Sequence, residues 1–309
     1  MTEALTPQTA PAPRNPAPRN EDTAAGFAYA VAAYLLWGFL PLYMKALALV
    51  PTLEVLAHRV IWSVPVALAV LAWRGRGADL RAALASRRML AMGALTAALI
   101  SVNWATYVWA IQSGHAMEAA LGYYINPLFS VLLGAVVLRE RLSRGQWLAI
   151  GLAAAAVAVL TIEAGRVPVV ALTLTLTWGL YAYFKKSLPL GPNQGFALEV
   201  LILSPAALGY VAFVALRGEM AFGSAPGVTA LLLGCGLVTA VPLMLYANGA
   251  KLLRLSTIGI MQYIAPTMIF LTAVLVFAEP FGGARLIAFP MIWAALALYT
   301  ASMFRGRAS

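Results

Sequence analysis

The sequence predicts an all-α, polytopic membrane protein with ten transmembrane helices, arranged as two inverted repeats of five helices. Three observations predict this fold. The 309 residues are 62% hydrophobic and only 10% charged, whereas soluble domains carry about a quarter charged residues. Apolar segments of about 20 residues, which is the length that crosses a bilayer, recur along the whole chain. Finally, the stretch at 122–140 returns in altered form at 261–279.

The predicted spans are joined by short loops and follow a polar tail. Residues 1–23 are rich in Pro, Ala and Asn, so we expect a disordered cytoplasmic tail there, and a second short cytoplasmic end at 305–309. Ser143 and Gln146 have the spacing of a capping box at the start of the fifth span. The ten spans are predicted at 27–48, 54–73, 90–111, 116–138, 146–163, 167–185, 195–216, 228–250, 256–278 and 284–304.

Positive charge is concentrated on one side of this arrangement. Sixteen Lys and Arg residues lie in the tails and in the loops on the same side, and three lie in the loops on the other side. The positive-inside rule therefore predicts that both termini are cytoplasmic, and it supports an even number of spans. The net charge of +10 is thus a topology signal, and we expect no nucleic-acid partner.

Matching residues in the two halves define the predicted repeats, 24–163 and 164–304. Because each repeat has five spans, the second enters the membrane upside down relative to the first, which is the inverted-repeat design of secondary transporters. The matching pairs include Trp37 with Trp178, Gly38 with Gly179, Arg59 with Glu199, Tyr107 with Tyr246, Tyr124 with Tyr263, and Pro127 with Pro266.

Four residues are predicted to interrupt helices at a common depth in the membrane. Pro127 and Pro266 lie in the middle of the fourth and ninth spans, and Gly38 and Gly179 in the middle of the first and sixth. Proline removes a backbone hydrogen bond, and the carbonyl that it frees is tolerated in a membrane where it lines a cavity. The alternative is that Gly and Pro are simply frequent in membrane helices. We predict that these four residues are hinges around a site at the repeat interface.

Polar and aromatic side chains gather around the predicted hinges. Tyr123 and Asn126 share one face of the fourth span, and Asn103 and Tyr107 share one face of the third. Buried polar groups are costly unless they are paired, so these groups should face the bundle interior. Each has the alternative role of an interhelical hydrogen bond, worth about 0.6 kcal/mol on average. The predicted substrate-binding residues are Trp37, Arg59, Asn103, Trp104, Tyr107, Tyr123, Asn126, Trp178, Tyr181, Glu199, Gln262 and Tyr263.

Arg59 and Glu199 carry opposite charges at equivalent positions of the two repeats. Their expected depths differ by roughly 15 Å along the membrane normal, which argues against a direct salt bridge. Arg59 is expected to face the outer half of a cavity, with Glu118 or a tyrosine hydroxyl as its partner. Glu199 is expected to face the inner half, near Lys186 or Lys251. The alternative for both is that their side chains snorkel to the nearest interface.

Several stretches resemble the RarD-type branch of the drug/metabolite transporter superfamily, also called EamA-type transporters. They are WGFLPLYMKAL, EVLAHRVIWS, NWATYVWAI and GYYINPL in the first half, and QYIAPT with Glu279 in the second. The resemblance covers about residues 26–304. It implies ten helices in two inverted repeats, a bacterial inner (plasma) membrane location, and export or exchange of small organic solutes such as amino acids, metabolites or amphenicol-like drugs.

We therefore expect a secondary-active transporter that works by alternating access, with a small-molecule solute and the lipid bilayer as its partners. No enzyme activity, cofactor or metal site is expected, because the chain has one cysteine (Cys235), two histidines, and neither an HExxH nor a GxxxxGK motif. An intramembrane lipid-modifying enzyme and a channel stay as alternatives. The residues leave the oligomeric state open, and they leave the coupling partner open between a proton and a counter-solute.

Overall fold

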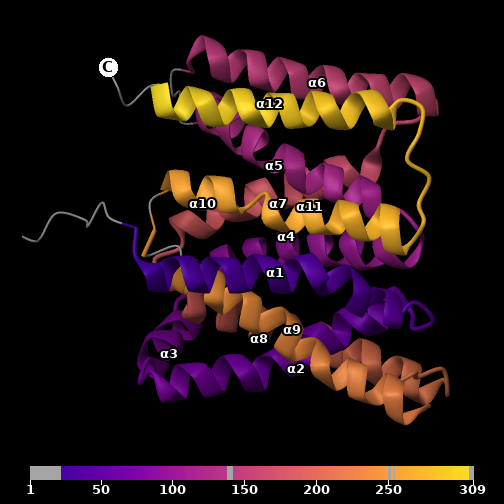
Figure 1. Cartoon of the computed structure of the whole chain (residues 1–309). Helices are drawn as coiled ribbons and strands as arrows, with labels where there is room; N and C mark the ends of the chain where they lie inside the picture. The colour runs from indigo at the N-terminus through magenta and orange to yellow at the C-terminus, as the bar shows by residue number, and fades with distance from the viewer. Residues whose placement is uncertain (1–21, 138–141, 250–251, 254, 306–309) are drawn as a thin grey trace, which may run out of the picture.

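Helices make up almost all of the chain that the computed structural model describes, which is residues 22–137, 142–249, 252–253 and 255–305 (Figure 1). No strand occurs within these residues. Most of the two predicted tails lies outside them. The first half contains α1 (Ala24–Ala46), α2 (Thr52–Trp73), α3 (Gly77–Ala85), α4 (Arg87–Gln112), α5 (Ala116–Val137) and α6 (Arg144–Ala164). The second half contains α7 (Val169–Ser187), α8 (Pro192–Leu216), α9 (Pro226–Gly249), α10 (Leu255–Met261), α11 (Ile264–Leu271), the π-helical η1 (Thr272–Val276) and α12 (Arg285–Arg305).

The prediction of an all-α polytopic membrane protein is confirmed. Eight helices in the described part of the chain are long and apolar enough to cross a membrane: α1, α2, α4, α5, α6, α8, α9 and the Arg285–Ser302 part of α12. The predicted sixth span is α7, a shorter and more polar helix of 19 residues. The predicted ninth span is divided into α10, α11 and η1. The count of ten spans therefore stays a prediction that rests on these two segments.

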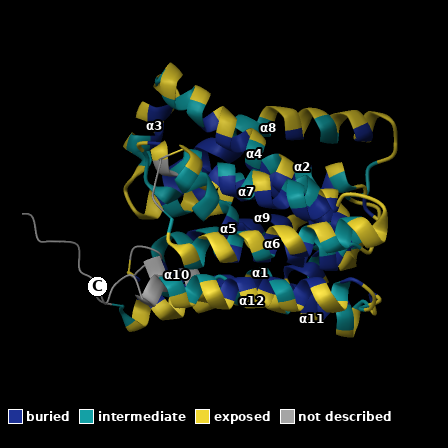
Figure 2. Ribbon diagram, turned by 90° about the horizontal axis from the view of Figure 1, so that it is seen from above, coloured by how far each residue is buried: buried dark blue, intermediate teal, exposed yellow. Residues whose placement is uncertain are grey.

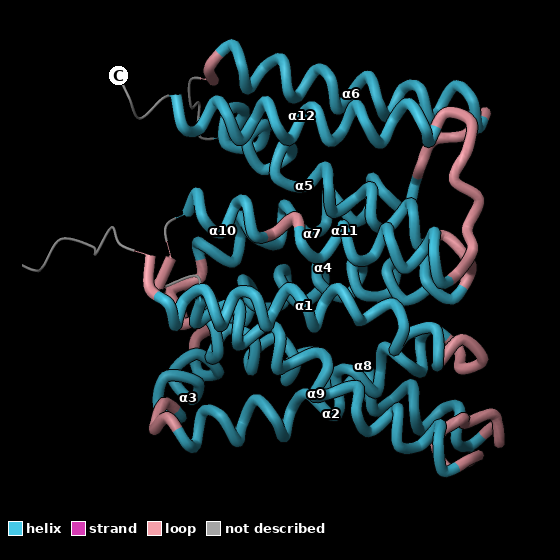
Figure 3. Tube along the Cα trace, in the orientation of Figure 1, coloured by secondary structure: helices cyan, strands magenta, loops and turns pink. Residues whose placement is uncertain are grey.

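The ninth predicted span breaks at Gln262 and Tyr263, where α10 ends and α11 begins (Figure 3). Pro266 is the third residue of α11, so its missing N–H falls in the first turn, where no helical acceptor exists. The break therefore precedes the proline. Pro127 behaves differently, because α5 continues through it. The expected interruption of the fourth span is thus not a break in the helix, and the hinge roles stay predictions.

A short helix that was not predicted, α3, lies in the loop between α2 and α4. It buries Leu80 and Ala83. Arg76 Nη2 lies 2.6 Å from Asp79 Oδ2, and Gln194 Nε2 donates to the same oxygen at 3.1 Å. These contacts hold the pKa of the Asp79 carboxyl below its usual value. The helix was missed because its nine residues hold too few apolar side chains to resemble a span.

Helices of the two halves pack against each other. α2 packs on α8 and α9, α1 on α9 and α11, α5 on α7, and α6 on α12. A Cβ at Gly38 would overlap the Met268 side chain, and a Cβ at Gly179 would overlap the Phe129 ring. Gly38 matches Gly179 in the predicted repeats, and Phe129 matches Met268, so the two crossings are equivalent. Both glycines thus permit close helix packing.

Side chains on the outside of the bundle are apolar, as a membrane-facing surface requires. Figure 2 shows exposed residues along the outer helices α6 and α12, whereas buried residues concentrate in the interior. On α6, Trp147, Leu148 and Ile162 are 54, 60 and 81% exposed. In water such a surface would be a large apolar patch, so its natural environment is lipid.

Gly236 lies at a close contact between α2 and α9, since a Cβ there would overlap the backbone carbonyl of Trp62. Backbone cannot move aside as a flexible side chain can. We therefore expect Gly236→Ala to lower the free energy of unfolding by about 3 kcal/mol, measured as a lower melting temperature of the purified protein. Gly209→Ala on α8 is the matched control, because its Cβ would meet no atom within 4 Å. Equal melting temperatures for the two variants would contradict this packing.

Candidate functional site

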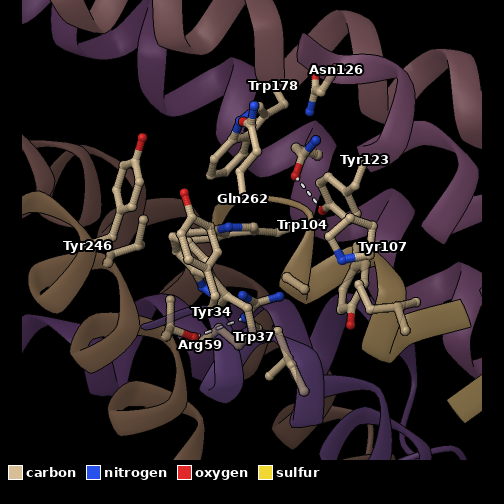
Figure 4. A pocket seen from close by; sticks show the side chains of 17 residues that line it. Tyr34, Trp37, Arg59, Trp104, Tyr107, Tyr123, Asn126, Trp178, Tyr246 and Gln262 are labelled. Atoms are coloured by element: carbon tan, nitrogen blue, oxygen red, sulfur yellow. Dashed lines mark hydrogen bonds between the residues drawn. The ribbon is translucent and has the colours of Figure 1, made fainter. Parts of the chain in front are cut away.

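A cavity of about 100 Å³ lies between the two halves of the bundle, beside the break between α10 and α11 (Figure 4). Its walls come from α1, α2, α4, α5, α7, α9 and α11, together with Gln262 at the break. The lining residues are Tyr34, Trp37, Leu40, Arg59, Asn103, Trp104, Tyr107, Tyr123, Asn126, Trp178, Thr239, Leu243, Tyr246, Gln262, Ala265, Pro266 and Ile269.

Nine of the twelve predicted substrate-binding residues line this cavity. They are Trp37, Arg59, Asn103, Trp104, Tyr107, Tyr123, Asn126, Trp178 and Gln262. Tyr181 contacts the lining residue Trp178, Glu199 contacts Tyr181, and Tyr263 lies elsewhere. The structure therefore brings most of the predicted set to one place, while solute binding by these residues stays a proposal.

The cavity is built from equivalent positions of the two predicted repeats. Five pairs contribute both of their members: Trp37 with Trp178, Trp104 with Leu243, Tyr107 with Tyr246, Tyr123 with Gln262, and Asn126 with Ala265. The pairs are alike in position but not in chemistry. At two of the pairs, the first half has Trp104 and Asn126 where the second half has Leu243 and Ala265. The two sides of the cavity therefore offer different groups to a solute.

Aromatic rings form a continuous wall. The Trp37 ring lies 6.2 Å from the Trp178 ring and 5.5 Å from the Tyr246 ring. Trp178 also contacts the rings of Tyr123 and Tyr181, at 6.3 and 5.8 Å. Such edge-to-face and tilted contacts are the preferred geometry of aromatic pairs. The wall joins helices of both halves and gives the cavity an apolar lining with polar edges.

Asn103 links three helices. Its Nδ2 donates to Thr177 Oγ1 at 2.9 Å and to the Leu174 carbonyl at 3.2 Å, both on α7, and its Oδ1 accepts from the Tyr123 hydroxyl at 3.2 Å. The amide is thus fully engaged in interhelical hydrogen bonds. This is the alternative role considered for the polar residues, so Asn103 holds α4, α5 and α7 together around the cavity.

Of the described residues that line the cavity, Arg59 is the one that carries a charge. It is 3% exposed, its Nε donates to Thr239 Oγ1 at 3.0 Å, and its guanidinium lies 4.7 Å from the centre of the Trp104 ring. Neither expected partner is the one found. Glu118 binds Arg166 instead, at 3.1 Å. Of the tyrosine hydroxyls in the lining, that of Tyr123 donates to Asn103, and that of Tyr107 has no partner among the described residues. Local sequence did not show that α9 packs on α2, so the contact with Thr239 was not expected.

Glu199 lies beside the cavity in a buried ion pair. Its Oε1 accepts from Lys185 Nζ at 2.6 Å, and its Oε2 accepts from the Tyr181 hydroxyl at 3.2 Å. The expected neighbours cannot be compared with this pair, because the Lys186 side chain and Lys251 lie outside what the structure describes. Because Lys185 is four residues after Tyr181 on α7, both reach the same carboxylate.

Tyr263 lies away from the cavity, in a separate groove with Tyr124, Thr267 and Trp293. Its neighbour Gln262 lines the cavity, and successive residues at a helix end point in different directions. Conversely, three lining residues with polar side chains were not among the predicted binding residues: Tyr34, Thr239 and Tyr246. Tyr246 could have been found as the repeat partner of Tyr107. Tyr34 and Thr239 lie three and seven residues from Trp37 and Tyr246, on the same helix faces.

Carboxylates join the two predicted repeats at the predicted outer side of the bundle. The Glu279 oxygens accept from the backbone N–H groups of Ala116 and Met117, at 2.7 and 3.0 Å, in the first turn of α5. Glu54 accepts from the N–H groups of Ala221 and Phe222, at 2.8 and 3.0 Å. These contacts, which we call the outer ties, are charge-assisted hydrogen bonds, and the helix dipole strengthens the one at α5.

Replacing Glu279 tests one outer tie. Glu279→Gln removes the charge and puts an NH₂ group opposite a backbone N–H donor, so we expect a loss of about 2 kcal/mol in the free energy of unfolding. Thermal unfolding of the purified protein measures it. Glu219→Gln is the control, since Glu219 and its partner Arg217 are 58 and 57% exposed and such a pair contributes about 0–1 kcal/mol. Similar melting temperatures in both variants would show that Glu279 does not hold the helices together.

The chain is similar to a family of transporters, to several bacterial proteins and to one solved structure. Residues 24–162 match the EamA-like transporter family. An uncharacterized transporter, YojE of Bacillus subtilis, is 41% identical, over 93% of this chain and 97% of its own length. The protein RarD of Streptomyces exfoliatus is 42% identical, over 89% of this chain and 88% of its own length. RarD of Escherichia coli is 37% identical, over 90% of this chain and 95% of its own length. One crystal structure shares the fold at 21% identity, with a TM-score of 0.61 over 90% of this chain and 98% of the other.

Proposed function

This chain belongs to the RarD-type branch of the EamA-like transporters, and from that premise we propose a secondary-active transporter that exports or exchanges small organic solutes by alternating access. Amino acids, metabolites and amphenicol-like drugs are the candidate solutes. The lining of the central cavity by equivalent positions of both repeats carries this proposal. In secondary transporters of inverted-repeat design, the solute site lies at the repeat interface near the middle of the bilayer.

The lining suits a small solute with an apolar body and a few polar groups. Rings of Trp37, Trp178 and Tyr246 offer flat apolar surface, while Arg59 and Asn126 offer hydrogen bonds. Binding pockets commonly combine such an aromatic wall with a small number of placed polar groups.

Alternating access requires contacts that form and break on the two sides of the cavity. The outer ties are the candidates on one side. On the other side, the Thr23 N–H donates to the Leu252 carbonyl at 3.3 Å, and Arg74 Nη1 donates to Asn248 Oδ1 at 3.1 Å. Gly38, Pro127, Gly179 and Pro266, with the break at Gln262, are the places where we propose that the helices bend.

Ligand-induced thermal stabilisation tests the proposed function. The purified protein is heated with amino acids, aromatic metabolites and amphenicols in turn, and a stabilising solute is then offered to proteoliposomes. We expect uptake of at least one such solute against its gradient when a proton or counter-solute gradient is imposed. Uptake that never exceeds equilibrium under either gradient would contradict a secondary-active mechanism.

The orientation in the membrane has its own test. In a chain carrying Cys235→Ala, single replacements Ala10→Cys and Ser309→Cys should react with a membrane-impermeant maleimide only in inverted vesicles, because the positive charge predicts that both ends are cytoplasmic. Cys235 is fully buried, so its removal leaves the surface unchanged. Labelling of either position in intact cells, where the reagent reaches only the outer side of the membrane, would overturn the predicted topology.

A further inference from the structure

The Arg59 guanidinium is buried with only part of its hydrogen-bonding capacity used. Its Nε bonds to the neutral hydroxyl of Thr239, and its Nη1 has no hydrogen-bond partner among the described residues. A buried cation is costly unless a negative group and hydrogen bonds compensate it. Within a membrane protein such a residue marks a functional site more often than a structural one.

Two further buried atoms without a partner line the same cavity. They are the Tyr107 hydroxyl and Asn126 Oδ1, again within the part of the chain that the structure describes. Arg59, Tyr107 and Asn126 line one cavity of only about 100 Å³, which is small enough for a single solute to reach all three. The Tyr123 hydroxyl already donates to Asn103. The cavity therefore offers two donors, from Arg59 and Tyr107, and one acceptor on Asn126.

The charges around the cavity leave Arg59 uncompensated. Among the residues that the structure describes, no carboxylate lines the cavity. The nearby Glu199 is bound by Lys185, and Glu118 is bound by Arg166. The Trp104 ring covers one face of the guanidinium, so a ligand has to approach the edge that carries Nη1. An anionic group at this edge would receive in-plane, charge-assisted hydrogen bonds.

We propose that the transported solute carries a carboxylate that binds Arg59 Nη1 and the Tyr107 hydroxyl, while its flat apolar body lies against the aromatic wall. This inference rests on the proposed function and names its substrate class. Two donors match the two oxygens of a carboxylate, and one cation neutralises its single charge. A phosphate monoester, with a charge of about −1.5 to −2, would stay partly uncompensated. A donor on the solute, such as an amino or hydroxyl group, would meet Asn126 Oδ1.

The test uses three probes of nearly the same shape and different charge: 3-phenylpropionate, 3-phenylpropionamide and 3-phenylpropylamine. Their affinities for the purified full-length protein are measured by calorimetry. We expect the carboxylate to bind at least about tenfold more tightly than the amide or the amine, because hydrogen bonds to a charged group are the stronger ones. Phenylalanine and indole-3-acetate extend the carboxylate series.

Variants then locate the carboxylate. Arg59→Lys should weaken carboxylate binding at least about tenfold, because a point charge does not reproduce the planar fork of arginine. Tyr107→Phe should weaken it by about tenfold and hardly change amide binding. Arg166→Lys, a change on the outer surface, is the control and should leave every affinity unchanged. If Arg59→Lys does not fold, Tyr107→Phe still tests the site. This change removes only one oxygen and keeps the ring, so the protein should still fold.

The outcomes separate this inference from the proposed function. Amide and amine binding as tight as carboxylate binding would overturn the inference, and so would unchanged carboxylate affinity in Tyr107→Phe. Failure of every carboxylate to bind would overturn it too. If a neutral or cationic solute is nevertheless transported, and Trp178→Ala abolishes that transport, the proposed function stands without the carboxylate site. If Trp178→Ala leaves the transport of every tested solute unchanged, both the carboxylate site and the proposed function are overturned.

Discussion

Trp178→Ala is expected to lower transport at least about 30-fold at matched amounts of folded protein. The Trp178 ring contacts Trp37, Tyr123 and Tyr181, so it joins the aromatic wall of the cavity across both repeats. Each aromatic pair contributes about 0.5–1.5 kcal/mol beyond the area that it buries. A loss of about 2 kcal/mol or more in solute binding corresponds to a factor of about 30 or more.

The matched control is Trp147→Ala. Trp147 is 54% exposed on α6 and does not line the cavity, so its loss should leave transport unchanged. Trp178→Phe keeps a ring and should retain intermediate activity. Folded protein is quantified by size-exclusion chromatography before uptake is compared. Equal uptake by Trp178→Ala and Trp147→Ala would remove the aromatic wall from the transport path.

Glu199→Ala is expected to lower the free energy of unfolding by about 3 kcal/mol. The carboxylate accepts from Lys185 at 2.6 Å and from Tyr181, and its side chain is only 2% exposed. Removing one partner of a buried pair leaves the other charge uncompensated, at a typical cost of about 3–5 kcal/mol. We expect a value in the lower part of this range. The Lys185 side chain is 20% exposed, so its unpaired charge would cost less than a fully buried one.

A double variant separates the cost of an unpaired lysine from the value of the pair. Glu199→Leu combined with Lys185→Met replaces both charges by apolar groups, which is often neutral or stabilising. Its melting temperature should therefore recover most of what Glu199→Ala loses. If the double variant is as unstable as the single one, the hydrogen bond from Tyr181 is the stabilising contact instead.

Much of the fold was predictable because the predicted spans are long and apolar. Each predicted span overlaps an observed helix, and the capping box of Ser143 and Gln146 is confirmed at the start of α6. Two features were not predictable in this way. The helix α3 is short and polar, so hydropathy does not reveal it. The ninth span breaks at Gln262 and Tyr263 rather than at Pro266, since a proline fits the first turn of the helix that follows.

The cavity was largely predictable from repeats and helix faces. The repeat match of Trp37 with Trp178, and the helical spacing of Tyr123 and Asn126, predicted one location for these residues, and all four line the cavity. The partners of charged residues were not predictable, because they depend on which helices meet in space. Arg59 bonds to Thr239, which is 180 residues away in sequence. No local pattern carries that information. Lys185 and Glu199, by contrast, are only 14 residues apart and lie on consecutive helices.

The central claim is that the cavity opens to one side of the membrane at a time. We test it with Leu243→Cys, a cavity position, in a chain carrying Cys235→Ala, and measure reaction with an impermeant thiol reagent from each side of the membrane. Glu279→Gln weakens an outer tie. If the two sides open alternately, this change should raise the reaction rate from outside and lower it from inside. Rates that rise together, as in a channel, or that do not respond on either side, would contradict alternating access.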